Sequence, residues 1–314
     1  MNTQLNTNTN STQTKENKIM SNTNQFIAGL IPTKDEVAHY IPRKHSGIEV
    51  QTILDWCVKN RINALLFGGA GTGKSELGRW YASQRQLPFA QLSANTAMSA
   101  NEFQGNWVNV DGKLTWKDSV YVDIIRHGGV LQFEEIDQLS DNVQFYLHSL
   151  ADGSRSITLT AHNYEVVKAH PDLLIIGSYN PNYRGRNPLS ESWADRFQMK
   201  LEYDYNRDIE SQYINSPALL ELMYGMRSTS VGASTSTNSN RSTIFETPVT
   251  GRMGKTFEAI AHDLGYELAC EVFANNFTPE ERPAVRMLLE GASWNIKDEL
   301  NLENNSITTE HESV

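Results

Sequence analysis

The stretch Gly68-Gly69-Ala70-Gly71-Thr72-Gly73-Lys74-Ser75 decides the fold of this chain. It follows the apolar run 64–67 and precedes the helix-like run 75–82, which predicts the order strand, glycine loop, helix. Glycines let the backbone curl until several N–H groups point at phosphate oxygens, and the following helix adds its positive end. The pattern G-x-x-x-x-G-K-S between a strand and a helix favours a phosphate-binding loop far more strongly than an ordinary glycine turn.

This loop predicts the residues that bind a nucleoside triphosphate and its metal. Lys74 can reach the β and γ phosphates, and the hydroxyl of Ser75 can ligate Mg²⁺. We therefore expect ATP and Mg²⁺ as ligands. The predicted nucleotide-binding residues are Gly68, Gly69, Ala70, Gly71, Thr72, Gly73, Lys74, Ser75 and Glu76.

Length and composition limit the class of protein. A chain of 314 residues with 39% hydrophobic content can hold one large or two modest domains. It lacks an apolar run of about 20 residues that could cross a membrane, and its amino end does not resemble a secretory signal. Cys57 and Cys270 lie far apart in the sequence, which fits a reducing compartment without disulfides. A cytoplasmic protein is expected.

Charge and low-complexity segments narrow the prediction further. The formal net charge of −10 argues against a protein that grips nucleic acid mainly through phosphates, although a local basic patch stays open. Residues 1–25 are rich in Asn and Thr and are predicted to be a disordered tail. Met20 is a conceivable internal start. A polar tail is expected over 299–314.

A second chemical element follows the predicted strand 130–135, which ends in Glu134 and Glu135. Paired acids at a strand end are often only solvated. At about sixty residues after the glycine loop, however, they suit a metal-dependent site. We expect Glu134 to hold the Mg²⁺ shell through water and Glu135 to polarise the attacking water.

Two further candidates lie later in the chain. The apolar run 173–178 suits a central parallel strand, and Asn180 comes at its carboxyl end, where ligands gather in open α/β sheets. This position favours water positioning over a simple turn. Arg196 precedes the predicted strand 199–203, and its guanidinium could stabilise charge on the γ-phosphate of an adjoining subunit. Arg184 and Arg186 are rival candidates.

Two β-hairpins are predicted between these elements. One spans 103–116 around the turn Asp111-Gly112, and the other joins 156–160 to 164–167. Trp107 and Trp116 either contact a partner from the first hairpin or pair across its strands. His162 and His170 lack acidic or cysteine partners at metal spacing and are interpreted as surface histidines.

From about residue 205 the pattern becomes helical. Helices are predicted at 218–226, 250–264, 266–273 and 279–290, with a flexible Ser/Thr-rich break at 228–243. Polar, frayed sequence is expected from Asn295, with a helical Asp298-Glu299-Leu300 as the alternative. The division is therefore 1–25 tail, 26–204 nucleotide-binding domain, 205–298 helical lid and 299–314 tail.

These features together resemble an AAA+ ATPase core. The segment from about Tyr40 to Tyr205 resembles the MoxR group and its CbbQ/NirQ/NorQ branch. The resemblance is carried by Ser178-Tyr179-Asn180-Pro181 with Tyr183, by Ala169-His170-Pro171-Asp172, and by Arg196-Phe197 followed by Glu202-Tyr203-Asp204-Tyr205. It implies an α/β fold: a P-loop core with a central parallel sheet flanked by helices, two β-hairpin inserts and a small C-terminal all-helical lid.

The resemblance also implies roles for particular residues. Lys74 and Ser75 would be the Walker A residues, Glu134 and Glu135 the Walker B pair, Asn180 sensor 1, Arg196 the finger entering the neighbouring site and Arg252 sensor 2. The catalytic set is thus Glu135, Asn180, Arg196 and Lys74, with Ser75 and Glu134 at the metal. The hairpins would be the helix 2 and pre-sensor inserts. The family usually has Asp where this chain has Glu134.

The implied activity is ATP hydrolysis by a homo-oligomer, usually a six-membered ring. The leading hypothesis is an ATP-driven remodelling chaperone or activase for a client metalloenzyme, with a partner that carries a von Willebrand A domain. One alternative is a nucleotide-dependent assembly switch with weak hydrolysis, and another is a chelatase or gas-vesicle motor subunit. A small-molecule P-loop kinase would not need Asn180, Arg196 or the hairpins.

Overall fold

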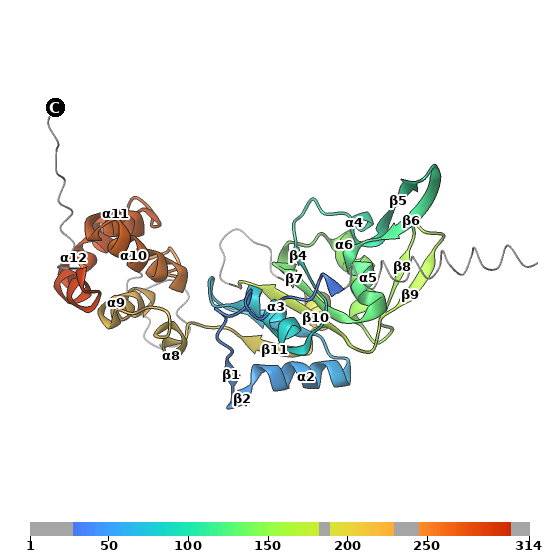
Figure 1. The fold of residues 1–314 in the computed structure, drawn as a ribbon, viewed down its shortest axis with the longest axis horizontal. Coiled ribbons are helices and arrows are strands. Elements are labelled where there is room, and N and C mark those ends of the chain that lie inside the picture. Colours follow the sequence, from blue (N-terminus) through green and yellow to red (C-terminus); the bar gives the residue numbers. More distant parts are fainter. Residues whose placement is uncertain (1–27, 182–188, 229–244, 303–314) are drawn as a thin grey trace, which may run out of the picture. The chain divides into compact units, whose positions relative to one another are not determined.

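The computed structural model of this chain describes residues 28–181, 189–228 and 245–302. These residues form an α/β unit, which comprises the chain up to Gly68 and Gly73–Tyr203, and a helical unit from Asp204 onward, to which Gly69–Thr72 of the glycine loop also belong (Figure 1). The predicted tail 1–25 and nearly all of the predicted break 228–243 lie outside the described residues, and Ser228 is the last residue of a helix.

The α/β unit is built on a five-stranded parallel sheet, as predicted. Its middle strands are wholly or largely buried because helices cover both faces, which explains their near-continuous apolar sequence. In spatial order the strands are β11 (Met199–Glu202), β3 (Ala64–Phe67), β10 (Leu173–Tyr179), β7 (Gly129–Glu134) and β4 (Phe89–Ser93).

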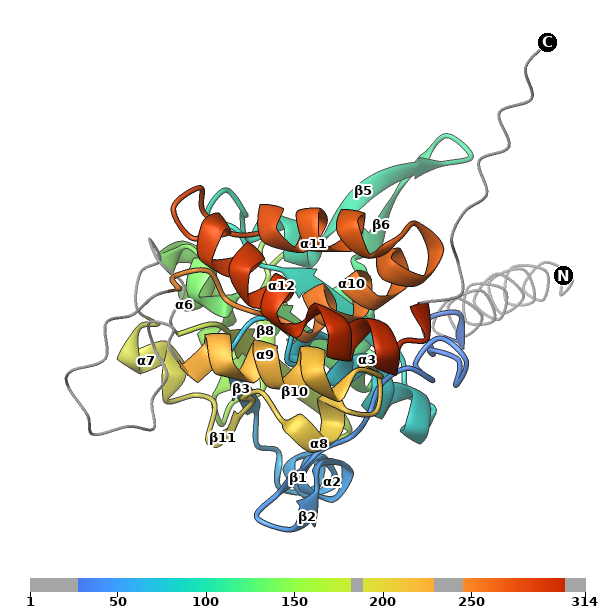
Figure 2. The ribbon, with the colours of Figure 1, turned by 90° about the vertical axis from the view of Figure 1, so that its left-hand side faces the viewer.

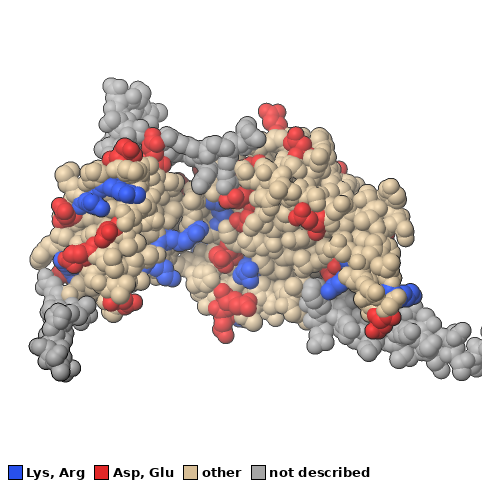
Figure 3. Space-filling view, turned by 90° about the horizontal axis from the view of Figure 1, so that it is seen from above, with Lys and Arg blue, Asp and Glu red and all other residues tan. Residues whose placement is uncertain are grey.

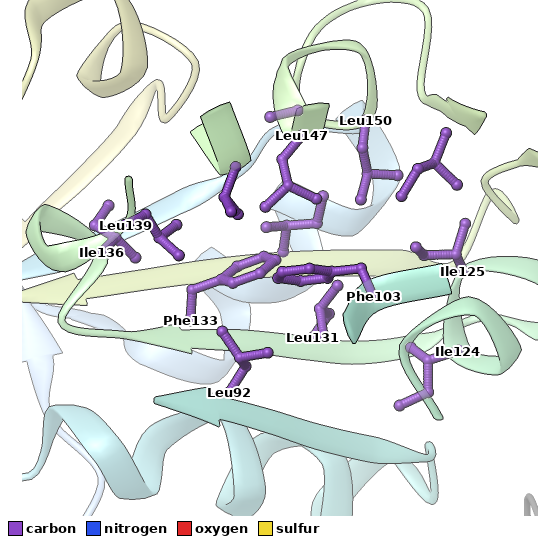
Figure 4. Close-up of a cluster of buried hydrophobic side chains, with 14 of the residues drawn as sticks. Leu92, Phe103, Ile124, Ile125, Leu131, Phe133, Ile136, Leu139, Leu147 and Leu150 are labelled. Carbon is purple, nitrogen blue, oxygen red and sulfur yellow. The ribbon is translucent and has the colours of Figure 1, made fainter. Parts of the chain in front are cut away.

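Successive side chains of the central strands enter different cores. Leu65, Leu131 and Phe133 pack with α5 (Val120–His127) and α6 (Asp141–Ala151), and Figure 4 shows this cluster. The neighbouring residues Leu66 and Val130 pack instead with α2 (Val50–Asn60) and α3 (Lys74–Arg85). Burying each large apolar side chain stabilises the fold by about 1.5–3 kcal/mol, so this alternation fixes the strand register.

Both predicted hairpins are present in the α/β unit. The first pairs β5 (Gly105–Val110) with β6 (Lys113–Asp118), and it projects from the unit in both ribbon views (Figures 1 and 2). Its turn residues Asp111 and Gly112 have φ of 51° and 80°, as a tight two-residue hairpin requires. The second pairs β8 (Ser156–Leu159) with β9 (Glu165–Lys168).

Short elements that the sequence did not predict complete this unit. They precede helices or connect strands, where a few residues carry little periodic signal. They are β1 (Lys44–His45), β2 (Ile48–Glu49), α4 (Asn101–Gln104), the 3₁₀ turn η1 (Ile136–Gln138) and α7 (Glu191–Ala194).

The helical unit packs its helices around a separate apolar core. Thr250 caps the helix that follows it by accepting a hydrogen bond from the Met253 backbone N–H. The helices are α8 (Arg207–Glu210), α9 (Pro217–Ser228), α10 (Gly251–Asp263), α11 (Tyr266–Asn275) and α12 (Arg282–Glu299).

The last helix is longer than predicted. The expectation of frayed sequence from Asn295 is wrong as far as residue 302, because Ile296 is fully buried in the core and Leu302 packs against it. The alternative of helix at 298–300 is confirmed for Asp298 and Glu299, and Leu300 is the C-cap. Glu299 is also fixed, since its Oε2 accepts a 2.5 Å hydrogen bond from Ser216 Oγ. Residues 303–314 of the predicted tail lie outside the described residues.

Within the described ranges, no helix combines the length and the apolar sequence needed to cross a bilayer. On the face drawn in Figure 3, Lys and Arg side chains are interspersed with Asp and Glu.

Candidate nucleotide-binding site

Three strands of the sheet bring the predicted site residues to one edge. Phe67 of β3 pairs with Tyr179 of β10, and Phe133 of β7 pairs with Gly177 of the same strand. The glycine loop, the two glutamates and Asn180 therefore begin within about one residue step, roughly 3.3 Å, of the same level. This is the carboxyl edge of a parallel sheet, where ligands of such folds bind.

The glycine loop leaves β3 in a conformation that only glycine adopts easily. Gly68 has φ of 140°, and a Cβ at this position would lie 2.2 Å from the backbone oxygen of Tyr203. The loop ends at Gly73, the N-cap of α3, whose φ is 92°. These two glycines let the loop pass close to the neighbouring strand and aim the start of the helix along the sheet edge.

Lys74 is the first residue of α3 and is largely buried, with 7% of its surface exposed. Its Nζ donates a 3.0 Å hydrogen bond to the carbonyl oxygen of Gly68, at the other end of the loop. Thr72 also folds onto the loop, since its Oγ1 donates 2.9 Å to the Gly69 carbonyl. The loop is thus held closed by the side chains of Lys74 and Thr72, and Lys74 is largely buried within it.

Ser75 and Glu134 meet between α3 and the end of β7. The Ser75 Oγ donates a 2.6 Å hydrogen bond to Glu134 Oε2, and Glu134 is only 8% exposed. A hydroxyl and a carboxylate oxygen at one point are the hard donors that Mg²⁺ prefers. The residues present therefore fit the predicted metal, and the extra methylene of Glu134 does not keep its carboxylate away from Ser75.

Gln132 is a buried polar residue of the site that sequence reasoning missed. Its Nε2 donates to the carbonyl oxygens of Lys74 (3.0 Å) and Ser75 (3.2 Å) and also to Oε1 of Glu134. Its Oε1 accepts a 2.9 Å hydrogen bond from the backbone N–H of Gly78. One signal was available, since a Gln within the apolar strand and two residues before Glu134 must lie on the same face as that acid.

Glu135 is the first residue beyond β7. The strand was predicted to include it, which is wrong, because its φ of 55° is a left-handed conformation that no strand contains. It is half-buried and serves as the N-cap of η1. Left-handed backbone at a residue other than glycine is uncommon and is concentrated at functional sites.

Asn180 directly follows β10 at the same sheet edge. Its Oδ1 is buried, and no residue in the described part of the chain donates a hydrogen bond to it. A buried amide oxygen without a donor is a place where a water or a ligand group can bind.

Arg196 lies at the amino ends of the parallel strands, whereas the glycine loop lies at their carboxyl ends. Met199, which follows it at the start of β11, pairs with Ala64, the first residue of β3. The four residues of β3, roughly 13 Å of strand, thus separate the level of Arg196 from the glycine loop. The guanidinium of Arg196 donates to the carbonyl of Ser192. The structure therefore does not bring Arg196 to the glycine loop of its own chain.

The other predicted residues have simpler surroundings. Glu76, in the first turn of α3, has a half-exposed side chain 3.7 Å from His39 Nε2. Arg252 is exposed in the first turn of α10, in the helical unit. Arg184 and Arg186 lie outside the described residues.

A tyrosine of the segment before α2 also approaches the loop. A Cβ at Gly73 would lie 3.4 Å from the ring of Tyr40, which packs 5.4 Å from the Trp80 ring. The Tyr40 hydroxyl is 3.5 Å from that of Tyr203. Burial, the largest influence, raises the pKa of Tyr40 to about 12, so its hydroxyl stays neutral in ordinary buffers.

The two hairpins are joined by an aromatic cluster. Trp107 and Trp116 are cross-strand partners, with ring centroids 5.5 Å apart. The His162 ring stacks on Trp116 at 4.7 Å, and its Nδ1 lies 2.8 Å from Glu165 Oε2. The tryptophans therefore do pair across the strands. His162, which was interpreted as a surface histidine, keeps 27% of its side chain exposed, and both tryptophans contact its ring.

A glycine loop, two acids and an asparagine on one edge of a parallel sheet define the P-loop class of nucleotide-binding folds. Comparison with known proteins narrows this class: residues 63–197 match the AAA domain family of the dynein-related subfamily. This segment of the chain is therefore similar to AAA domains.

The relatives agree with the resemblance drawn from the sequence. The chain is 29% identical over 157 residues to protein CbbQ of Hydrogenophilus thermoluteolus, a match that covers 49% of this chain and 58% of CbbQ. It is 26% identical to NorQ of Paracoccus denitrificans, covering 53% and 60%. It is also 26% identical to the denitrification regulatory protein NirQ of Pseudomonas aeruginosa, covering 51% and 61%. The resemblance to this AAA+ branch is confirmed.

The matching segment spans about 60% of the length of these relatives. Among solved structures, a RuvB variant from Thermotoga maritima covers 76% of this chain and 68% of its own, at 17% identity and a TM-score of 0.43. Because this score is low, the fold assignment depends on the sheet order and the family match.

Proposed function

We propose that this chain is a Mg²⁺-dependent ATPase of the MoxR type that remodels or activates a client metalloenzyme. The observation that carries the proposal is the Ser75–Glu134 contact beside a closed glycine loop, with Glu135 and Asn180 on the same sheet edge. Apart from Glu134, where the family usually has Asp, these are the residue types that ATP hydrolysis uses at those places.

The chain's own residues divide the work of hydrolysis. Lys74 leaves the Gly68 carbonyl and binds the β and γ phosphates, which its buried position strengthens. Ser75 and Glu134 would hold Mg²⁺, which neutralises charge on the same phosphates. Glu135 accepts the proton of the attacking water, and the buried Oδ1 of Asn180 orients that water.

Arg196 completes the site of a neighbouring copy in this proposal. Its place at the far edge of the sheet supports action between subunits, because it is remote from the loop of its own chain. A six-membered ring, with Arg252 as a further contact to ATP, follows from the family resemblance. The hairpins would contact the client, and a von Willebrand A domain protein would assist, in the cytoplasm.

A second function is a nucleotide-dependent assembly switch with weak hydrolysis. The direct contact of Ser75 with a glutamate, where the family usually has an aspartate, favours it. Turnover by the wild-type chain separates the two, since the switch predicts ATP-driven assembly at a background rate of hydrolysis. A chelatase or gas-vesicle motor would share the site and differ in its client.

The test combines two variants that should each abolish turnover. Glu135→Gln should bind ATP with wild-type affinity and hydrolyse it at least about 100-fold more slowly. Arg196→Ala should show the same loss, while Glu102→Gln, an exposed glutamate of α4, should not. Mixing the two inactive variants should restore about a quarter of the wild-type sites, because a random ring pairs an intact Glu135 with an intact Arg196 at that frequency.

Two results would contradict the proposal. One is hydrolysis at the wild-type rate by Glu135→Gln. The other is a chain that stays monomeric with ATP and keeps its turnover after Arg196→Ala.

A further inference from the structure

The side chain of Gln132 connects the start of α3 to the end of β7 at the candidate metal position. It is fully buried in β7, and its amide bonds the carbonyls of Lys74 and Ser75, the N–H of Gly78 and the carboxylate of Glu134. A buried amide is costly unless it is hydrogen-bonded, and here both ends are satisfied.

The start of α3 is shaped around this amide. A Cβ at Gly78 would lie 2.0 Å from Gln132 Oε1 and 3.1 Å from its Cδ. Any larger residue at Gly78 would displace the amide, because the Gln132 side chain lies where a Gly78 side chain would be.

The two oxygens of Glu134 each receive one donor. Oε1 accepts from Gln132 Nε2, and Oε2 accepts from Ser75 Oγ at 2.6 Å. Glutamate has one more rotatable bond than aspartate, and therefore more freedom to lose when its carboxylate is fixed. A donor at each oxygen removes that freedom before any ligand arrives.

We propose that Gln132 is a positioning residue that holds the Glu134 carboxylate against Ser75 and thereby sets the affinity of the site for Mg²⁺. This inference rests on the proposed function. It explains how a glutamate serves at a position where related proteins usually carry an aspartate: the added length is restrained by an amide from two residues earlier on the same strand face.

The test compares two buried glutamines. Gln132→Met keeps the length of the side chain and removes the amide. Gln144→Met is the matched control, since Gln144 is buried on α6 and bonds the Leu139 carbonyl and the Ser190 hydroxyl, away from the site. Mg²⁺ titrations of ATP binding and of turnover are run on both, together with ATP binding in EDTA and thermal unfolding.

We expect Gln132→Met to raise the half-saturating Mg²⁺ concentration by about 10-fold or more, as loss of an outer-shell partner does at other metal sites. ATP binding in EDTA should change less than about 2-fold. Gln144→Met should leave both quantities at their wild-type values. In a Glu134→Asp background, Gln132→Met should change the Mg²⁺ dependence less, because the shorter acid depends less on the amide.

A second variant guards against loss of folding. Gln132→Leu combined with Gly78→Ala fills the space of the Gln132 amide with apolar atoms and still leaves Glu134 without its donor. Equal Mg²⁺ dependence in the folded Gln132 and Gln144 variants would overturn the role of Gln132 and would leave the proposed function standing. A wild-type chain whose ATP binding ignores Mg²⁺ would overturn the proposed function as well.

Discussion

The Ser75 hydroxyl and the Glu134 carboxylate form a 2.6 Å hydrogen bond that ties the first turn of α3 to the end of β7. The bond joins the second residue of α3, just after the glycine loop, to the acid that ends β7. In a site that binds Mg²⁺ the Ser75 oxygen would ligate the metal through a lone pair, while its hydrogen could still be donated to the Glu134 carboxylate. The same contact therefore supports both the fold of the free chain and the arrangement that the metal needs.

Ser75→Ala removes the hydroxyl from the carboxylate. We expect the free energy of unfolding of the ligand-free chain to fall by about 1–2 kcal/mol, since the lost bond involves a charged acceptor. The same change should abolish the stabilisation that Mg²⁺ with ATP gives. Thermal and urea unfolding measure both effects. Ser190→Ala, which removes a 3.0 Å bond to Gln144 away from the site, should keep the ligand effect. A Ser75→Ala chain that is still stabilised by Mg²⁺ with ATP would contradict the assignment.

The hydrogen bonds to the Glu281 carboxylate should make the stability of the helical unit depend on pH. Burial alone would raise its pKa, but hydrogen bonds from Thr247 Oγ1 and from the backbone N–H groups of Glu246, Thr278 and Thr247 outweigh it and lower the pKa from 4.5 to about 2. The unfolded chain then binds more protons below pH 4.5. The carboxylate therefore contributes about 1–3 kcal/mol of stability above pH 4.5, which is lost as the pH falls toward 2.

Glu281→Gln tests this dependence. The variant should be less stable by about 1–3 kcal/mol at pH 7 and should lose less stability between pH 4.5 and 2 than the wild type. The neighbouring Glu280, which is exposed, provides the control: Glu280→Gln should follow the wild-type curve. Parallel pH profiles for Glu281→Gln and wild type, measured by urea unfolding, would sink the prediction.

The packing of His162 against two tryptophans should make each hairpin stabilise the other. His162→Ala removes the ring that contacts Trp107 and Trp116, so about 0.5–1.5 kcal/mol of aromatic packing is lost. The Trp107 indole N–H, which donates 3.1 Å to the Ala161 carbonyl across the hairpins, should then exchange with solvent faster. NMR of the indole signals measures this. His262→Ala, on the exposed surface of α10, is the control, and equal exchange in both variants would refute the coupling.

The hydrogen bond from the buried Arg155 guanidinium to Asn63 should contribute to the stability of the fold. Its Oδ1 accepts a 2.6 Å hydrogen bond from Arg155, and its Nδ2 donates to the carbonyls of Ala151 (2.7 Å) and Arg196 (2.8 Å). Asn63→Leu leaves Arg155 buried with one partner fewer and should lower the free energy of unfolding by about 2–4 kcal/mol.

The control for Asn63 is another asparagine amide. Asn60→Leu removes a 2.8 Å bond from an exposed Nδ2 to the Trp56 carbonyl, and it should cost under about 0.5 kcal/mol. Chemical denaturation measures both variants. An Asn63→Leu chain as stable as the Asn60→Leu chain would show that Arg155 does not need this acceptor.

The sequence predicted the parts of the fold that have a strong local signal. The glycine loop, the buried strands and the Asp111-Gly112 hairpin each depend on residues close together in the chain, and the structure has all three. Element ends were less predictable: Glu135 looked like strand because its left-handed backbone leaves no trace in the composition. Asn295 looked frayed because the burial of Ile296 depends on distant helices.

Contacts between distant segments explain what the sequence could not supply at the site. Except for Glu134, the hydrogen-bond partners of Gln132 lie 54 to 58 residues earlier in the chain. They could therefore be identified only from the folded structure. The same holds for His162, whose aromatic neighbours belong to another hairpin. Residue roles that depend on a second copy, such as that of Arg196, need an assembly and stay predictions.

The placement of the glycine loop and Arg196 at opposite ends of the adjacent strands β3 and β11 gives each subunit a direction. A contact that joins one end of a copy to the other end of the next is heterologous, and it leaves both outer ends open for further copies. Such growth stops only if the rotation per step closes a circle, and otherwise it continues as a helical filament. If Arg196 reaches the site of the next copy, each copy in the series contributes to two sites, and a single defective subunit would then impair its own site through the loop and a second one through its guanidinium.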